Sequence, residues 1–230
     1  MTSIKIILTE TSHPGNIGAV ARAMKVMGFK HLRLVNPKRF PDTEAYNLAT
    51  HAYDILDQAQ CFTTLEEALG DCQYIFATSS RARKHPLPVI KPRMLKKMVE
   101  ENPGHYAIVF GNEQSGLSNE QMQLAQKQII IPTNPLAPVL NLAQACQIIL
   151  YELFEVKSTE QSSEKDDSPS MHTDTTYLIK QAQTVLSDLN MNNHQTQRMM
   201  TQFINRAQLS QREVNFLNGF FRAIRDKTTP

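Results

Sequence analysis

Short apolar segments alternate with helical patterns along the first 156 residues, and this alternation restricts the fold more than any other feature of the sequence. The strand-like segments are almost entirely apolar, which is typical of strands buried on both faces. They lie at 4–9, 31–37, 74–80, 105–111 and 128–132. The helical patterns between and after them lie at 17–27, 64–71, 92–101, 118–125 and 140–156. Strands that alternate with helices predict an α/β fold built on a parallel sheet.

The helical pattern at 140–156 also bears on assembly. Most of the circumference of the expected helix is apolar, through Leu142, Ala145, Ile148, Ile149 and Leu153. A helix of that kind must be covered on more than one side. We therefore expect it to lie partly in a contact between two copies of the chain.

The composition changes after residue 156. Residues 157–176 are rich in Ser, Thr, Asp and Glu and contain almost nothing apolar, which is typical of a flexible linker. Three helical patterns follow, and from Thr175 onward seven Lys or Arg stand against three Asp or Glu. The last pattern begins with a capping-box spacing and has one apolar face, comprising Ser210, Glu213, Val214, Leu217, Phe220, Phe221 and Ile224. The expected organisation is a main domain over 1–156, a linker over 157–176 and a basic helical extension over 177–230.

Bulk composition narrows the class of protein. With 41% hydrophobic and 20% charged residues among 230, the chain has the composition of a globular protein. No run of about 18 apolar residues occurs, and the first segment lacks the layout of a signal peptide, so we expect a cytoplasmic protein without a membrane span. Cys61, Cys72 and Cys146 show neither CxxC spacing nor a nearby histidine set. We expect buried, unreactive thiols and no metal site.

Basic residues are segregated along the chain, although the formal net charge is only +2. The stretch 22–39 contains six Lys or Arg and no acid, and the stretch 81–97 contains seven and no acid. Such segregation favours a surface that binds a polyanion, RNA or DNA. The alternative is an ordinary solvated surface on which these charges mix with acids in space.

Several common site signatures are missing. No GxGxxG follows a strand, and GxxxxGK[ST], HExxH and GxSxG do not occur. What remains are loops that leave the carboxyl ends of the expected strands, where ligands of α/β sheets collect. They are ETSHPGN (10–16), ATSS (77–80), FGNEQSGLS (110–118) and IPTNPLAPVLN (131–141). The third places two of only eight glycines around a glutamate, which favours close approach of the backbone to a ligand.

Three of these segments carry a resemblance to a known family. ETSHPGNIGAVARAM, FGNEQSGLS and IPTNPLAPVLNLAQA, in that order, resemble the motifs of the SpoU branch of the SPOUT methyltransferases. The longer opening ETSHPGNIGAVARAMKVMGF and the terminal QREVNFLNGFFRAI are similar to the TrmJ type, which are tRNA cytidine/uridine 2′-O-methyltransferases. The resemblance is strong over 4–156 and weaker over the C-terminal helices.

The resemblance implies a sheet with a deep C-terminal trefoil knot, a homodimer, and S-adenosylmethionine bound in the knot largely by backbone groups. The cofactor pocket would be lined by Thr78, Ser79, Ser80, Gly111, Ile131, Pro138, Val139 and Leu140. Gly111 would let the backbone come against the cofactor, because a side chain there would collide with it. Plain core packing remains the alternative for Ile131 and Leu140, and a strand-ending turn remains the alternative for 78–80.

The same resemblance assigns four residues to chemistry. Arg22 would grip the phosphate beside the reactive ribose and stabilise developing alkoxide charge, because a guanidinium stays protonated and is a poor base. Asn16 would cap the first helix or orient the substrate. Glu113 would hold the arginine or asparagine of the first motif, or be a solvated loop residue. Asn141 would bond the active-site backbone or the substrate, or only cap the last helix.

One position departs from the family pattern. Val139 stands where these enzymes usually have a serine, two residues before Asn141, so a hydroxyl hydrogen bond is lost there. The leading hypothesis is 2′-O-methylation of cytidine or uridine at position 32 of tRNA, the first nucleotide of the anticodon loop. A ribosomal-RNA 2′-O-methyltransferase is the nearest alternative, and a non-catalytic RNA-binding relative is the second.

Overall fold

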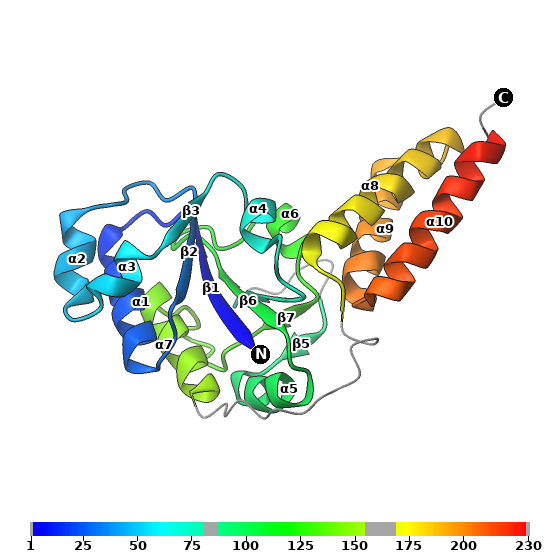
Figure 1. The fold of residues 1–230 in the computed structure, drawn as a ribbon. Coiled ribbons are helices and arrows are strands. Elements are labelled where there is room, and N and C mark those ends of the chain that lie inside the picture. The colour runs from blue at the N-terminus through cyan, green and yellow to red at the C-terminus, as the bar shows by residue number, and fades with distance from the viewer. Residues whose placement is uncertain (1, 81–86, 155–168, 229–230) are drawn as a thin grey trace.

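The computed structural model describes residues 2–80, 87–154 and 169–228. Seven strands form one sheet in the order β3-β2-β1-β6-β4-β7-β5, and every neighbouring pair is parallel (Figure 1). The strands are β1 Ser3–Thr9, β2 His31–Val35, β3 Gln60–Phe62, β4 Tyr74–Thr78, β5 Val89–Ile90, β6 His105–Phe110 and β7 Lys127–Ile129. The predicted α/β fold on a parallel sheet is confirmed.

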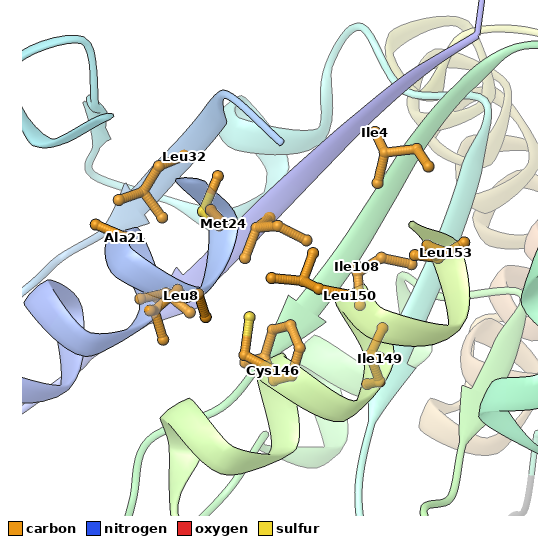
Figure 2. Close-up of a cluster of buried hydrophobic side chains, with 14 of the residues drawn as sticks. Ile4, Leu8, Ala21, Met24, Leu32, Ile108, Cys146, Ile149, Leu150 and Leu153 are labelled. Carbon is orange, nitrogen blue, oxygen red and sulfur yellow. The ribbon is translucent and has the colours of Figure 1, made fainter. Parts of the chain in front are cut away.

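Helices cover both faces of this sheet, and alternate strand residues pack against each layer. Ile6 and Leu8 of β1 belong to the core beneath the first layer, whereas Ile7 faces the second. The first layer contains α1 Pro14–Val26, α2 Thr43–Ala49, α3 Tyr53–Asp57, α5 Leu95–Glu101 after the short helix η1 Pro92–Met94, and α7 Leu142–Leu153. The second contains α4 Leu65–Leu69 and α6 Asn119–Gln123. Figure 2 shows the first core, with Met24 of α1 and Leu150 of α7 against the sheet.

Four elements between the expected ones were not predicted from the sequence. Helices α2 and α3 are short, and only two residues of each are buried. Strands β3 and β5 occupy the two edges of the sheet, with three and two residues. Edge strands and short helices bury little apolar surface, so their sequences lack the continuous apolar runs that predict a buried strand.

An ion cluster of two buried cations and one exposed carboxylate changes the interpretation of the basic stretch 22–39. Arg33 is only 8% exposed and forms a bidentate ion pair with Asp71, with N–O distances of 2.6 and 2.9 Å. Lys5, 5% exposed, lies 3.3 Å from the same carboxylate. Lys25 and Arg39 pair with acids on the surface. Arg33 was therefore wrongly counted with the polyanion-binding surface: its β-strand position points it into the protein.

Replacing Asp71 should destabilise the fold more than replacing a surface partner. Asp71→Asn leaves two buried cations without their counterion, and we expect a loss of about 1–3 kcal/mol of unfolding free energy. Asp54→Asn, which removes the exposed partner of Lys25, should cost less than about 1 kcal/mol. Urea denaturation of both variants measures the difference. Equal losses for the two variants would contradict the structural role of the cluster.

The same pair has a pH signature. The hydrogen bonds from Arg33 hold the pKa of Asp71 well below its ordinary value, despite partial burial, which opposes this. Since the folded state favours the ionised form, the added stability is present above the ordinary aspartate pKa near 4 and is lost as the pH falls below it.

The cysteines agree only in part with expectation. Cys72 and Cys146 are buried, and burial raises the pKa of the Cys72 thiol to about 12. Cys61 is exposed, so the prediction of a buried thiol is wrong there. It lies on the edge strand β3, where one side of the sheet has no further strand to cover it.

Three helices form a separate bundle at the C-terminal end. They are α8 His172–Asp188, α9 His194–Ala207 and α10 Gln211–Thr228, and they extend away from the side of the sheet that carries α4 and α6 (Figure 1). Leu178 and Ala182 of α8, Ile204 of α9 and Val214 of α10 form their core. The reciprocal Ser210–Glu213 bonds at the start of α10 are present as expected. Phe220 does not belong to the buried face, because its side chain is 52% exposed.

The bundle is joined to the main domain by specific polar contacts. The main-chain N–H of His172 donates to Cys72 O at 2.9 Å, and Asn205 Nδ2 donates to Gln123 O at the end of α6 at 2.6 Å. Helix α8 begins at His172, so its first five residues belong to the segment 157–176 that was expected to be a linker. Main-chain N–H groups of His172 and Thr173 donate to Cys72 O and Gly70 O and hold this first turn against the main domain. Residues 157–168 of that segment lie outside the described part of the chain.

Candidate active site

Four loops meet at the carboxyl ends of adjacent strands and enclose a cavity of about 440 Å³. They follow β1, β4, β6 and β7, which are neighbours in the order β1-β6-β4-β7. The expected residues that line it are Asn16, Thr78, Ser79, Ser80, Gly111, Glu113, Ile131, Pro138, Val139, Leu140 and Asn141. The structure thus brings together every sequence-predicted site residue except Arg22. Their individual roles stay predictions.

Glu113 ties the loop after β6 to the loop after β1. Its Oε2 accepts hydrogen bonds from the Ser12 main-chain N–H at 3.0 Å and the Ser12 hydroxyl at 2.8 Å. Its Oε1 accepts from Asn16 Nδ2 at 2.9 Å and from the His13 main-chain N–H at 3.2 Å. Partial burial would raise the pKa of this carboxyl, but these donors lower it to about 2. Glu113 is therefore a structural acceptor held as the carboxylate, and not a solvated loop residue.

Asn141 and Asn16 extend this network to the last helix of the main domain. The Asn141 side chain caps α7, because its Oδ1 accepts a hydrogen bond from the Ala143 main-chain N–H at 2.8 Å. Capping of this helix was one of the two roles expected for Asn141. Its Nδ2 also donates to Asn16 Oδ1 at 3.1 Å. The two asparagines and Glu113 thus form a continuous chain of hydrogen bonds from α7 through α1 to the loop after β6.

The geometry of the loop itself requires both glycines of FGNEQSGLS. A Cβ atom on Gly111 would lie 2.3 Å from the backbone of Gly116 and of Leu117. Gly116 itself has a φ of +69°, a left-handed conformation that favours glycine. Gly111 is thus required by the closure of its own loop, which the Asn112–Gly116 bridge completes. This collision within the protein is a second reason for glycine at position 111, and the expected close approach of its backbone to the cofactor stays a prediction.

The walls of the cavity combine apolar side chains with a few polar groups. Ile131 and Leu140 contribute apolar surface, and Ile131 also packs against the first core, so the core alternative is partly right for it. The Thr78 hydroxyl donates to Val109 O at 3.1 Å, and Ser79 N–H donates to Ile129 O at 3.2 Å. Since these two groups pair with neighbouring strands, they fix the cavity wall. An apolar pocket of this size with convergent polar groups fits a nucleoside-sized ligand such as S-adenosylmethionine.

Arg22 lies apart from the cavity. It is six residues beyond Asn16 on α1 and lines a second, shallower hollow between α1 and α7 together with Val26, Gln144 and Ile148. Leu140 borders both hollows. Among the described residues the Arg22 guanidinium has no ion pair, so it is available to an anion that lies across the two hollows.

His13 and Thr133 also line the cavity but were not predicted from the sequence. His13 is the N-cap residue of α1, directly before Pro14, and makes no capping bond through its side chain. The Thr133 hydroxyl donates to Pro138 O at 3.1 Å and closes the loop after β7. The sequence feature that could have identified His13 as a site residue is its place in the loop ETSHPGN (10–16), where Glu10 is the other ionisable residue.

The described residues contain no cluster of three or more His, Cys, Asp or Glu arranged to hold a metal ion. In the same part of the chain no helix is long and apolar enough to cross a membrane.

A parallel sheet with a cavity at the carboxyl ends of its strands is the architecture of an α/β enzyme that binds a nucleoside-sized ligand. The chain belongs to the SpoU rRNA methylase family, whose model matches residues 3–151. Its relatives include the tRNA (cytidine/uridine-2′-O-)-methyltransferase TrmJ of Salmonella typhimurium, which is 37% identical over 97% of each chain. TrmJ of Klebsiella pneumoniae is 45% identical over 66% of this chain and 64% of its own.

Solved structures extend the similarity to the complete fold. TrmJ from Z. mobilis ZM4 superposes with a TM-score of 0.89 at 28% identity and covers 97% of this chain and 100% of its own. A methylase family protein from Haemophilus influenzae Rd KW20 gives a TM-score of 0.65 at 34% identity, with 98% and 97% covered. The first likeness includes the C-terminal bundle, because it spans nearly all of both chains.

Proposed function

We propose that the protein transfers a methyl group from S-adenosylmethionine to the ribose 2′-hydroxyl of cytidine or uridine in tRNA, at position 32. The observation that carries this proposal is the whole-chain similarity to enzymes named for 2′-O-methylation of cytidine or uridine in tRNA. The cavity and its Asn16–Glu113–Asn141 network lie at the carboxyl ends of the strands. SpoU-family membership supports methyl transfer to RNA, and the TrmJ relatives support tRNA as the RNA.

The chain's own residues would bind and orient the two reactants. S-adenosylmethionine supplies an electrophilic methyl group when it is bound. The apolar wall around Ile131 and Leu140 would bury the base of the cofactor, and main-chain groups of 78–80 and 111–116 would meet its polar parts. Alignment of the ribose with the methyl group is the largest contribution that such a site can make, roughly 7 kcal/mol in well-oriented systems.

Arg22 would hold the phosphate beside the target ribose. Its position at the border of the two hollows supports this role, since an RNA strand crossing that border would place a phosphate near the guanidinium and a ribose near the cavity. The basic bundle 177–230 would add further phosphate contacts, and a protein that binds through phosphates loses affinity steeply as salt rises.

We further propose a homodimer that acts in the cytoplasm. Large apolar side chains are exposed on this side of the molecule. They are Val26 of α1 (63% exposed), Tyr151 of α7 (68%) and Phe154 directly after α7 (54%). A second copy packed on α1 and α7 would cover these side chains, with Arg22 left at the border of the contact and open to RNA. The trefoil knot stays an expectation from the family.

The test is a methyl-transfer assay with labelled S-adenosylmethionine and, separately, unmodified tRNA and ribosomal RNA. Nuclease digestion and mass spectrometry locate the product. A 2′-O-methyl pyrimidine at position 32 of tRNA is the expected result. Product only on ribosomal RNA would replace the proposed substrate, and cofactor binding without product on either RNA would favour a non-catalytic relative.

Arg22→Ala should lower kcat/KM for tRNA by about 10²-fold, because one charged donor to the developing charge is removed. Cofactor affinity, measured by calorimetry, should stay within about twofold, since Arg22 does not line the cavity. Lys30→Ala is the matched control, because Lys30 is an exposed cation in the same basic stretch. A loss of equal size in Lys30→Ala would show that only overall charge is being measured.

A further inference from the structure

The proposed reaction releases a proton from the ribose hydroxyl, and the groups at the cavity differ in their ability to accept it. Arg22 is a guanidinium and stays protonated in proteins. Glu113 already accepts four hydrogen bonds through both oxygens, from Ser12, His13 and Asn16. Its lone pairs point to those donors, so it has little capacity left for a substrate proton.

His13 is the other ionisable residue that lines the cavity in the described part of the chain. Its main-chain N–H is fixed by Glu113 at 3.2 Å, and Pro14 begins α1 directly after it, so the backbone position of His13 is well defined. The side chain is exposed, and no hydrogen bond or ion pair to its ring occurs among the described residues. The backbone of His13 is therefore fixed while its ring has no partner within the protein, so the imidazole can form a hydrogen bond with a substrate group.

We infer that His13 is the general base of the methyl transfer, an assignment that rests on the function proposed above. The ribose O–H bond breaks and its proton passes to a ring nitrogen of His13. The oxygen electron pair forms the new bond to the methyl carbon as the carbon–sulfur bond of the donor breaks. The imidazolium then releases its proton to water, which restores the base.

Three other elements that carry charged residues lie near the backbone on either side of His13. Glu113 lies on the loop after β6, and Glu44 of α2 lies beside Gly15 in the first turn of α1. Lys38, in the loop after β2, has its main-chain N–H bonded to Thr11 O two residues before His13.

The test compares His13→Gln with wild type in methyl transfer to tRNA across pH 5.5–9. In the wild type kcat should rise with pH as the imidazole loses its proton and becomes able to accept another, and should then level off. His13→Gln should be about 10²-fold slower at neutral pH and should lose this rise. Free imidazole added to His13→Ala should restore part of the rate. His51→Gln, an exposed histidine away from the cavity, should change nothing.

A second measurement needs no turnover. In the protein without methyl donor, the ring signals of His13, assigned by their absence in His13→Gln, should change their titration when tRNA is added. A tRNA with a 2′-deoxy target nucleotide should not cause this change. Wild-type transfer to tRNA with an unaltered rate and pH profile in His13→Gln would overturn the role of His13 alone. Failure of the wild type on every RNA would overturn the proposed function with it.

Discussion

Glu113→Gln is expected to lower kcat/KM by about 10³-fold and to reduce stability by about 2 kcal/mol. The carboxylate accepts from Ser12 and His13 main-chain N–H groups, the Ser12 hydroxyl and Asn16. A glutamine offers one oxygen, and its NH₂ group would face donors in place of an acceptor. The loop after β1 would then lose its attachment to the loop after β6. Steady-state kinetics and thermal denaturation measure the two effects.

Ser115→Ala is the matched control for this variant. Ser115 lies on the same loop, is exposed, and makes only long hydrogen bonds of 3.3–3.5 Å with Asn112 and Gly116. Its replacement should leave kcat/KM within about threefold. If Glu113→Gln behaved like Ser115→Ala, the carboxylate would be a surface residue and the network would have no role.

The carboxylate of Glu113 also predicts how the site responds to acid. Its pKa of about 2 lies below the ordinary glutamate value near 4.3, so the folded state prefers the ionised form. The stability that it contributes is complete above about pH 4.3 and is lost as the pH falls toward 2. The wild type should therefore lose more stability than Glu113→Gln over this window, which thermal denaturation at a series of pH values can measure.

Gly111→Ala is expected to abolish cofactor binding while the protein stays folded. The new Cβ would lie 2.3 Å from two backbone positions of the same loop, Gly116 and Leu117, and backbone atoms cannot swing aside as a flexible side chain can. The loop must open, and the cavity wall that it forms opens with it. Calorimetric titration with S-adenosylmethionine measures the loss, and circular dichroism reports on the fold.

Alanine substitutions at two other glycines serve as controls for the loss of cofactor affinity in Gly111→Ala. Gly116→Ala meets no atom within 4 Å but is strained by its φ of +69°, so a smaller loss of affinity and about 1 kcal/mol of stability are expected. Gly219→Ala lies within α10 with nothing within 4 Å, and should raise stability by up to about 1 kcal/mol. Normal cofactor affinity in Gly111→Ala would show that the loop can adjust and that the steric reason given for this glycine is wrong.

The central strands and the capping residues could be predicted from the sequence because their signals are local. Strand β6 is a continuous apolar run, and Asn141 and Ser210 cap the helices that follow them. The position of Arg33 could not be predicted, because its burial depends on Asp71, 38 residues away. Because charged residues are rarely buried unless they are paired, a charged residue in a strand is predicted to be exposed as long as its partner is unknown.

The candidate site was predictable as a set of loops but not as a network. The carboxyl ends of parallel strands meet at one edge, which places 10–16, 77–80, 110–118 and 131–141 together. Which side chains bond to which depends on loop geometry that spans about a hundred residues, as for Asn16 and Glu113. His13 was overlooked for the same reason, since only the structure shows that Glu113 is fully occupied and leaves the imidazole as the free group.

The sheet order has a consequence for the synthesis of the chain. Strand β1 lies between β2 and β6, and its residues Ser3–Leu8 pair with His105–Phe110. At about 5–20 residues per second, the ribosome releases β1 several seconds before its second neighbour exists. For that interval an apolar strand edge is open to pairing with other nascent chains. The enzyme is thus exposed to chaperones and to misassembly early in translation, and Ser12 can meet Glu113 only after β6 has emerged from the exit tunnel.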